Sequence, residues 1–377
     1  MRVAIYLHTL FNGGIERVMF DLAAEMMRRG IAVDFVVNTV QYSPMLDHLP
    51  HGAALVNLDC RRFSHRLPRL LRYLRAARPD GLLSAGHFSN EIAILARIFS
   101  RSGTRCVVTE HTNLRAELKT LKRLSPRRLA IPLLCSLLYR FADAMVAVSD
   151  GVRLDCQRLF RLSPSRCLTI RNPLDSAAIR LKSLEPLDHP WLRPGQPPVV
   201  LAIGRLELQK DFQTLLDAFD LLRQHIDARL IVLGEGSQRA ALLDQVHHLQ
   251  LDLSVTFPGF VANPYPWLRL ASVFCVSSRW EGLSVSLLEA LALGTPAVST
   301  DCPSGPREVL QNGQWGTLVP VGDCPALAAA LLRAIHQATP PASQDALDSY
   351  RVDSVTDRYL AVLLPASTSV HVGVLSQ

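Results

Sequence analysis

Two carboxylates stand eight residues apart in the stretch RWEGLSVSLLEALALGTP, which runs from Arg279 to Pro296. Glu281 precedes an expected helix and Glu289 lies inside it, with Gly294 placed to end that helix. Ser286 and Glu289 have the spacing of a capping box, in which the glutamate accepts a hydrogen bond from a backbone N–H at the helix start. A helix that starts directly after a glycine-containing turn also offers free N–H groups and a positive dipole end to an anion. A helix cap and an anion-binding junction are both compatible with this stretch.

Further residues that could bind an anion or a sugar follow other expected strands. Gly13 and Gly14 lie between the first strand and a helix, so their N–H groups could approach a phosphate or a hydroxyl. Arg205 and Lys210 follow a later strand, and two cations at this place could hold a diphosphate. His111 closes the strand CVVTEH, although an isolated histidine is more often a satisfied structural residue than a catalytic one.

The elements that would position these residues alternate between strands and helices, in two successive halves of the chain. The β-rich runs of the first half are VAIYLH, VDFVVN, GLLSAG, CVVTEH and AMVAVS. After the proline-rich segment LDHPWLRPGQPP the alternation starts again, with VVLAIGRL, RLIVLGEG, SVTFPGF, VFCVSS and PAVSTD. This order is typical of parallel, doubly wound sheets, in which ligands bind beyond the carboxyl ends of the strands. The sequence therefore predicts an α/β fold of two Rossmann-like domains that face each other across a cleft.

The length of 377 residues is also more than one hydrophobic core usually fills. We expect a first domain at residues 1–185, a second at residues 197–347, and a last helix with a tail at residues 348–377. Glu235 then ends a strand of the second domain, and Phe260 follows the next one.

The N-terminal run, the longest apolar stretch and the cysteine pattern indicate the cellular compartment of the chain. The apolar N-terminal run is too short for a signal peptide and is better explained as a strand. The apolar stretch from Leu129 to Ser149 contains Pro132, Arg140 and Asp143, so we expect a buried helix followed by a strand instead of a membrane span. The eight cysteines form no CxxC pair, which indicates neither a disulfide framework nor a zinc site and favours a reducing cytoplasm.

The charge is distributed unevenly along the chain. Residues 1–182 carry 28 Lys and Arg against 14 Asp and Glu, a balance of +14, whereas the remainder carries 12 against 19, a balance of −7. The basic residues concentrate between Arg61 and Pro79 and between Leu118 and Arg128. These segments could be solvated helix faces, or they could contact anionic lipid headgroups or an anionic substrate. Nucleic acid is not expected, because no recognised binding motif accompanies the charge.

Taken together, the motifs resemble one known family. They are GGIE (13–16), EH (110–111), GRL with Lys210, LGEG (233–236), PGF (258–260), EGLSVSLLEALALGTP and STDCPSGPREVL (299–310). Their order is similar to that of the retaining nucleotide-sugar glycosyltransferases of family 4, from the first strand to about Tyr359. The resemblance implies the GT-B fold, with two Rossmann-like domains and the active site between them. It also implies that the helix in DSYRVDSVTDRYLAVL (348–363) crosses back to the first domain.

The resemblance assigns roles to individual residues. Glu289 matches the family glutamate that binds the ribose hydroxyls of the donor nucleotide, and Glu281 matches the one beside the donor sugar. Arg205 and Lys210 match the pair that neutralises the diphosphate in place of a metal, so neither a metal nor another cofactor is expected. His111 matches the histidine near the donor sugar. The other residues of the expected nucleotide-sugar site are Gly13, Gly14, Glu235, Phe260, Gly282, Leu283 and Ser284.

The resemblance also implies the mechanism and leaves the substrates open. Retention normally indicates a nucleophilic carboxylate, but no residue here is a convincing nucleophile, and the family is generally described by a front-face substitution. Ser237 stands where many relatives have proline, and Leu283, Ser284 and Ser286 replace a common Phe, Gly and Pro, which leaves donor preference and turn geometry open.

We therefore expect a hexosyltransferase or N-acetylhexosaminyltransferase of cell-surface polysaccharide or glycolipid synthesis. Its donor would be a UDP-sugar, and its acceptor a saccharide, in particular a lipid-linked one. A GDP-mannose-dependent mannosyltransferase, an epimerase or phosphorylase on the same fold, and a binding protein without turnover are the alternatives. The basic first domain predicts peripheral attachment to an anionic membrane surface, on the inner face of the cytoplasmic membrane.

Overall fold

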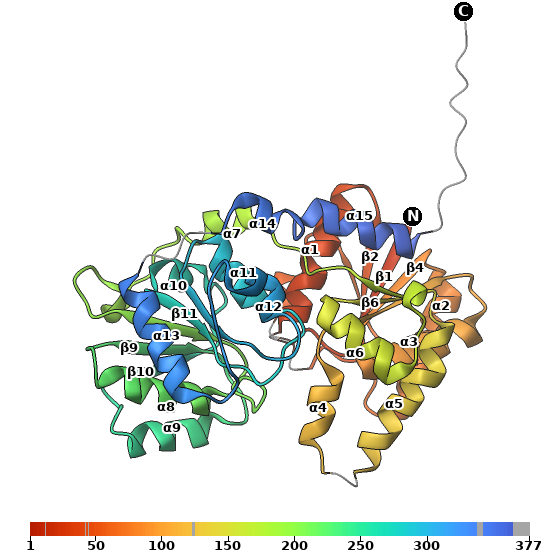
Figure 1. Cartoon of the computed structure of the whole chain (residues 1–377). Coiled ribbons are helices and arrows are strands. Elements are labelled where there is room, and N and C mark those ends of the chain that lie inside the picture. The colour runs from red at the N-terminus through yellow and green to blue at the C-terminus, as the bar shows by residue number, and fades with distance from the viewer. Residues whose placement is uncertain (12, 42, 44, 123–124, 338–341, 365–377) are drawn as a thin grey trace, which may run out of the picture.

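The computed structural model describes residues 1–377 except 12, 42, 44, 123–124, 338–341 and 365–377. It contains two parallel sheets, each flanked by helices, and the two sheets belong to two lobes that lie side by side (Figure 1). The fold is therefore the predicted pair of Rossmann-like domains. The tail at residues 365–377, which was predicted to follow the last helix, lies outside the described residues.

The first domain is built on a seven-stranded sheet with the order β3-β2-β1-β4-β5-β6-β7. Its strands are β1 (Arg2–Leu7), β2 (Ala32–Val37), β3 (Ala54–Asn57), β4 (Gly81–Ala85), β5 (Arg105–Glu110), β6 (Ala144–Ala147) and β7 (Cys167–Thr169). Its helices are α1 (Gly14–Arg28), α2 (Arg66–Ala77), α3 (His87–Ser100), α4 (Leu114–Thr120), α5 (Pro126–Leu138) and α6 (Asp150–Phe160). The next helix, α7 (Ser176–Lys182), follows β7 in the chain but packs against α10 (Tyr265–Leu270) and α11 (Val285–Ala292) of the second domain (Figure 1).

The second domain repeats the arrangement with a six-stranded sheet of order β10-β9-β8-β11-β12-β13. Its strands are β8 (Val199–Ile203), β9 (Arg229–Leu233), β10 (Val255–Gly259), β11 (Val273–Val276), β12 (Ala297–Thr300) and β13 (Thr317–Val319). Its helices are α8 (Phe212–Arg223), α9 (Arg239–His248), α10 (Tyr265–Leu270), α11 (Val285–Ala292), α12 (Pro306–Val309) and α13 (Cys324–His336).

Neighbouring strands of both sheets pair in parallel, and crossover connections join successive strands. Every residue of β4, β6 and β11 is buried, which matches their nearly continuous apolar sequences. In both sheets the strand order reverses direction at the first strand, between β1 and β4 and between β8 and β11. The loops at these two switch points are the expected place for a ligand.

The last helices, α14 (Gln344–Asp348) and α15 (Val352–Leu363), run along the top of both lobes in Figure 1. α15 packs against α1 of the first domain, and Tyr359 and Leu363 are fully buried in the core that contains β1 and β2. Arg105 Nε donates a hydrogen bond of 2.6 Å to the carbonyl oxygen of Val362. The end of the chain therefore completes the packing of the first domain.

α5 differs from the expectation of a buried helix, which is wrong. Cys135 is its only buried residue, whereas Leu129 and Leu133 are 71% and 63% exposed and Leu134 and Leu137 are also exposed. The physical reason is that α5 and α4 project from the domain, and α5 has neighbours on one side only, in α3 and α6 (Figure 1). Among the described helices, none combines the length and the apolarity needed to cross a bilayer.

Candidate active site

Glu281 lies in the loop that follows β11 and is 5% exposed. The Lys210 ammonium lies 2.6 Å from its Oε1 atom, and the Ser278 hydroxyl donates to the same oxygen at 2.6 Å. Lys210 reaches this place from the loop between β8 and α8, with its side chain packed over Gly204. The structure thus brings together two of the predicted catalytic residues, at the switch point of the second sheet.

Glu289 lies inside α11, is 3% exposed, and is contacted from both domains. Arg17 of α1 lies 3.4 Å from its Oε1 atom, and the Tyr265 hydroxyl donates to that oxygen at 3.2 Å. Burial and the Glu289 carboxylate raise the pKa of Tyr265 well above its ordinary value, so this hydroxyl keeps its proton and can donate. Glu289 is therefore a hydrogen-bonded, buried acceptor at the junction of the two domains.

The capping-box interpretation of Ser286 and Glu289 is wrong. α11 begins at Val285, so Ser284 is the N-cap residue, and no side chain caps it. Because the helix starts before Ser286, the carboxylate of Glu289 lies too deep in the helix to reach the first backbone N–H groups. The free N–H groups at the start of α11 leave the second interpretation, an anion-binding junction, in place.

Gly282 packs directly against the first domain. A Cβ atom at this position would overlap the carbonyl oxygen of His111, so only glycine fits. Asn113 N donates to Glu281 O at 3.2 Å, and Ser149 Oγ donates to Gly282 O at 2.7 Å. Two successive carbonyls of the loop that carries Glu281 are therefore held by the first domain.

His111 follows the last residue of β5 at this contact. Its Nε2 atom lies 2.9 Å from the Thr109 hydroxyl oxygen. Burial lowers the pKa of His111 to about 4, so the imidazole is neutral at neutral pH. A neutral imidazole beside the loop can exchange hydrogen bonds with a sugar, but it does not supply a positive charge.

The predicted glycine pair forms the start of α1, opposite α11. A Cβ atom on Gly14 would lie 3.4 Å from the Val285 side chain, which shows how closely the starts of the two helices approach. The carboxylate of Glu16 turns back onto Gly13, and burial raises the pKa of Glu16 to about 7 while the positive charge of Arg205 opposes this rise. Arg205 is exposed, and its charge acts on this carboxylate of the first domain.

The other predicted residues lie at the same sheet edge or at the start of α11. Leu283 and Ser284 are buried in the turn before α11. Glu235 follows β9, with its carboxylate over Gly259 and 3.7 Å from Arg239, and Phe260 follows β10 and is exposed. Because β9 and β10 lie on the far side of β8 from β11, these two residues lie farther from Glu281 along the edge.

Ser237, which departs from the family pattern, has a local explanation. Its backbone N–H and its hydroxyl both donate to the Glu207 carboxylate, at 3.0 and 2.7 Å. The N–H bond is also the main reason why the pKa of Glu207 is lowered. A proline here would lose both bonds, so the serine fixes the loop after β8 to the loop after β9.

Several site residues were not predicted from the sequence. They are Glu16, Arg17, Asn113, Ser149, Tyr265 and Ser278. Asn113, Ser149 and Ser278 do follow strand ends, which is a usable signal, but small polar residues are common in such loops. Arg17 and Tyr265 carry no such signal, because they are set beside Glu289 only by the packing of α1 and α10 around α11.

The family models match most of the chain. The model described as Glycosyltransferase Family 4 matches residues 12–178, and the model described as Glycosyl transferases group 1 matches residues 197–337. A curated relative from Campylobacter jejuni is 30% identical over 85% of this chain and 86% of its own. That relative is N-acetylgalactosamine-N,N'-diacetylbacillosaminyl-diphospho-undecaprenol 4-alpha-N-acetylgalactosaminyltransferase. The amylovoran biosynthesis glycosyltransferase AmsD of Erwinia amylovora is 26% identical over 66% of both chains.

Solved structures share the fold at low sequence identity. HepE of Anabaena in complex with UDP-glucose superposes with a TM-score of 0.76 at 18% identity, covering 95% of this chain and 98% of that one. A TarM variant of S. aureus, in complex with UDP and other ligands, gives a TM-score of 0.75 at 12% identity, covering 96% and 99%. Both likenesses confirm the GT-B fold.

Proposed function

The chain belongs to glycosyltransferase family 4, and from this premise we propose that it transfers a sugar from a UDP-sugar to a lipid-linked saccharide, with retention at the anomeric carbon. The observation that carries the proposal is the cluster of Lys210, Ser278 and Glu281, which is followed directly by Gly282, whose backbone packs against that of His111 at the domain junction.

The diphosphate of the donor would be held by positive charge without a metal. Lys210 is fixed by Glu281 beside the end of β8, and the charge of Arg205 acts on Glu16 of the first domain. The N-terminal N–H groups of α11 and α1 face each other nearby and add the positive ends of two helix dipoles. Negative charge develops on the diphosphate as it departs, so these fixed groups stabilise the transition state more than the ground state.

The nucleoside would bind at Glu289. This carboxylate is buried, yet Arg17 and Tyr265 contact only its Oε1 atom. A second oxygen is then left to accept hydrogen bonds from vicinal ribose hydroxyls. The UDP present in the HepE and TarM structures supports a uridine nucleotide, which we take as the donor nucleotide of this chain.

A front-face substitution suits the geometry better than a covalent intermediate. Glu281 is the carboxylate that we propose to lie beside the donor sugar, but Lys210 and Ser278 both donate hydrogen bonds to its Oε1 atom, which weakens it as a nucleophile. We assign Glu281 to binding the donor sugar and the neutral His111 to a hydrogen bond with the same sugar. The departing phosphate oxygen would then accept the proton of the acceptor hydroxyl.

The acceptor class follows from the relatives. The Campylobacter jejuni relative acts by name on a diphospho-undecaprenol saccharide, and AmsD is named for the biosynthesis of amylovoran. We therefore propose a saccharide on a lipid diphosphate as acceptor, and a hexose or N-acetylhexosamine as the transferred sugar.

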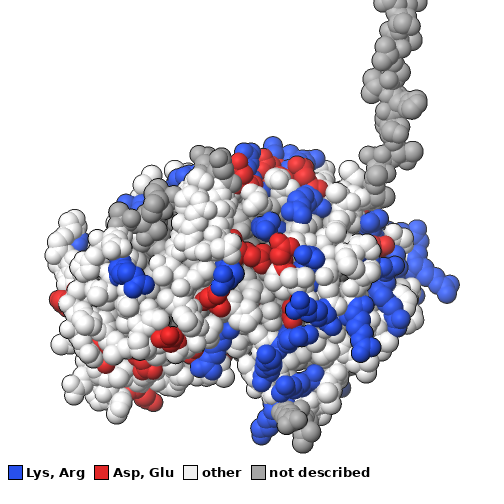
Figure 2. All heavy atoms as spheres, viewed as in Figure 1, with Lys and Arg blue, Asp and Glu red and all other residues white. Residues whose placement is uncertain are grey.

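A lipid-linked acceptor requires the enzyme to reach a membrane, and α5 offers the surface for this. Leu129, Leu133 and Leu137 are spaced by four residues, so they form one exposed stripe. Exposed basic residues flank it: Lys119, Lys122, Arg127 and Arg140. Figure 2 shows Lys and Arg gathered over the first domain, including its projecting lower end, which Figure 1 identifies as α4 and α5. We propose that this surface docks peripherally on anionic lipid.

The segment between Arg61 and Pro79 is less suited to this role than its composition indicated. Arg69 donates to the carbonyl oxygens of Leu58 and Asp59, and Arg75 donates to that of Phe99. These guanidinium groups are partly used within the domain. We therefore place the centre of the docking surface on α5.

The test is a screen of nucleotide sugars with purified protein and saccharides linked to a lipid diphosphate. UDP-glucose, UDP-galactose, their N-acetylamino forms and GDP-mannose are each supplied, and free nucleotide and product are measured. We expect nucleotide release from one UDP-sugar only when acceptor is present, with an anomeric configuration in the product that matches the donor. Glu281→Gln should remove transfer while UDP binding persists.

Other results would redirect the assignment. Release from GDP-mannose alone would make the chain a mannosyltransferase, and nucleotide-sugar binding without release in any combination would make it a binding protein. An inverted product would contradict the front-face mechanism.

A further inference from the structure

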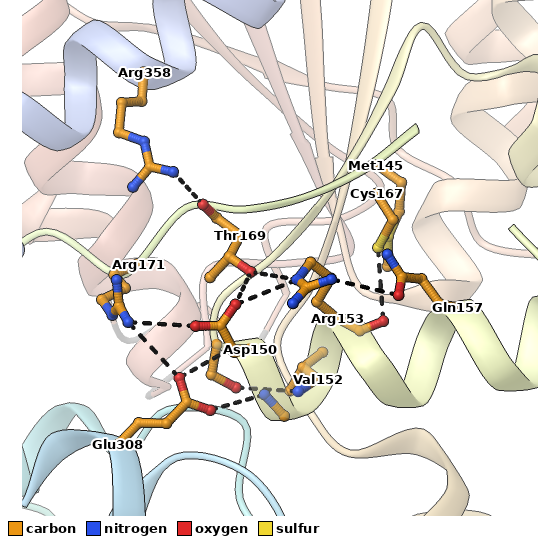
Figure 3. A network of polar contacts seen from close by, with 12 residues as sticks. Met145, Asp150, Val152, Arg153, Gln157, Cys167, Thr169, Arg171, Glu308 and Arg358 are labelled. Atoms are coloured by element: carbon orange, nitrogen blue, oxygen red, sulfur yellow. Dashed lines mark hydrogen bonds and ion pairs between the residues drawn. The ribbon is translucent and has the colours of Figure 1, made fainter. Parts of the chain in front are cut away.

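A carboxylate from the second domain caps a helix of the first domain. Glu308 of α12 accepts hydrogen bonds from the backbone N–H groups of Asp150, at 2.9 Å, and Gly151, at 2.8 Å (Figure 3). These are the first two residues of α6, so the carboxylate lies on the positive end of its dipole. Arg171 lies 4.0 Å from Glu308 and 3.5 Å from Asp150, and its charge reduces the repulsion between the two carboxylates.

The segment that leads to Glu308 touches the donor loop, defined here as Glu281 and Gly282. Glu281 N donates to Pro303 O at 3.2 Å, and a Cβ atom on Gly305 would lie 3.0 Å from the carbonyl oxygen of Gly282. The donor loop therefore rests on residues 303–305, immediately before the helix that carries Glu308.

The other side of the donor loop is hydrogen-bonded to the first domain, beside the start of α6 that Glu308 contacts. Ser149, whose hydroxyl donates to Gly282 O, directly precedes Asp150. Asn113 donates through its backbone to Glu281 O, and through its side chain to Ser304 Oγ at 2.9 Å. The donor loop thus lies between residues 303–305 of the second domain and Asn113 and Ser149 of the first domain. Glu308 connects these two sides to each other.

We propose that Glu308 is a positioning residue, which holds the donor loop against the first domain and so couples domain closure to the placement of Glu281 beside His111. The inference rests on the proposed function, because the role of the donor loop in sugar transfer is part of that proposal. Glu308 itself touches neither of these two residues. It acts through α6 and residues 303–305, and its own side chain is partly accessible to water, so the contact can break when the domains separate.

The chain offers a matched control beside Glu308. Glu308→Gln keeps the length of the side chain but removes the charge and one good acceptor, and Glu308→Asp keeps the charge on a shorter side chain. Arg307→Gln changes a charge on the same helix, but Arg307 pairs with Asp301 inside the second domain. All variants are assayed for kcat, donor KM, the UDP dissociation constant and the melting temperature.

Domain closure is measured separately, as the distance between two spin labels in the presence of UDP. The labels are carried by Ser165→Cys in the first domain and Leu253→Cys in the second, both exposed positions. Cys60→Ser and Cys324→Ser remove the half-buried native thiols.

We expect Glu308→Gln to lower kcat about tenfold, since hydrogen bonds to a charged group are typically of this strength. The donor KM should rise, the label distances should shift to longer values, and Arg307→Gln should match the wild type. The kcat, donor KM and label distances of Glu308→Asp should lie between those of Glu308→Gln and the wild type. UDP should still bind to Glu308→Gln, because the residues proposed to hold it, Arg205, Lys210 and Glu289, belong to the second domain.

A lower melting temperature of Glu308→Gln with unchanged kcat, KM and label distances would overturn the inference in favour of a purely structural cap. Failure of the wild type to bind UDP or to transfer any sugar would instead overturn the proposed function. The label distances would then still report whether Glu308 holds the two domains together.

Discussion

At the scale of single residues, Lys210 and Arg205 are positive groups with different surroundings. Lys210 is held by Glu281, whereas Arg205 is exposed and acts on acidic residues of the first domain. We expect Lys210→Ala and Arg205→Ala each to lower kcat about 100-fold or more, because each removes a fixed charge that stabilises the departing diphosphate. Arg223→Ala, which breaks a surface ion pair with Asp227, serves as control and should leave kcat unchanged.

The same assay tests independence from metals. Activity should survive chelation with EDTA, since the cations of the chain would neutralise the diphosphate. Complete loss with EDTA and recovery with a divalent metal would contradict this assignment, as would near-normal turnover in both variants.

A substitution of Glu289 should change donor binding without a large change in stability, because Glu289 does not cap α11. We expect Glu289→Gln to weaken UDP binding about tenfold, since an amide accepts more weakly than a carboxylate from ribose hydroxyls. The melting temperature should change little, because the amide oxygen can still accept from Arg17 and Tyr265. Calorimetry with UDP and thermal unfolding check the two parts, and Ser286→Ala should affect neither. A large melting shift without a binding defect would return Glu289 to a structural role.

His111 makes stability depend on pH in a definite direction. Its folded pKa of about 4 lies below the ordinary value of 6.5, so only the unfolded chain binds the proton between these values. The free energy of unfolding is therefore highest above pH 6.5, and it falls as the pH drops towards 4 because protons then bind to the unfolded chain. We expect the wild type to lose on the order of 2 kcal/mol more than His111→Gln over this range, measured by urea unfolding. The exposed His247→Gln is the control, and parallel pH curves for wild type and His111→Gln would contradict the burial of His111.

At the scale of helices and strands, the sequence predicted those elements whose apolar pattern follows directly from their own burial. The strands were predictable because parallel strands buried on both faces need continuous apolar runs, as in VFCV of β11. The exposure of α5 was not predictable, since an apolar helix looks the same whether or not a partner covers it. The start of α11 was missed because both Ser284 and Ser286 could precede a helix, and the structure begins the helix at Val285, after Ser284.

The exposed stripe of α5 leads to a prediction about membranes. We expect the protein to sediment with vesicles that contain anionic lipid at low salt and to be released at high salt. Leu129→Ser combined with Leu133→Ser should reduce sedimentation several-fold, because the apolar part of the attachment is lost. Leu253→Ser, at an exposed leucine of the second domain, is the matched control and should bind like the wild type. Equal binding of the wild type to neutral and anionic vesicles would contradict the docking surface, and so would no binding to either.

At the scale of the whole molecule, the site depends on contacts between residues far apart in the sequence. Glu308 and Asp150 are separated by 158 positions, and Arg17 and Glu289 by 272. The motifs predicted the second-domain half of the site because Glu281 and Lys210 both follow strand ends of a single sheet. The interdomain partners could not be predicted in this way, because their contacts arise only from the placement of one complete domain against the other.

The packing of α15 has a consequence for the synthesis of the chain. The first domain takes Tyr359 and Leu363 into its core, although its own sheet ends at Thr169. A ribosome therefore releases all seven strands of this domain, and then the entire second domain, before the helix that covers α1 and Gly81 emerges. Until then the surfaces of α1, β4 and β5 that α15 covers are open to chaperones or to other chains. The domain that is made first is the one that is completed last.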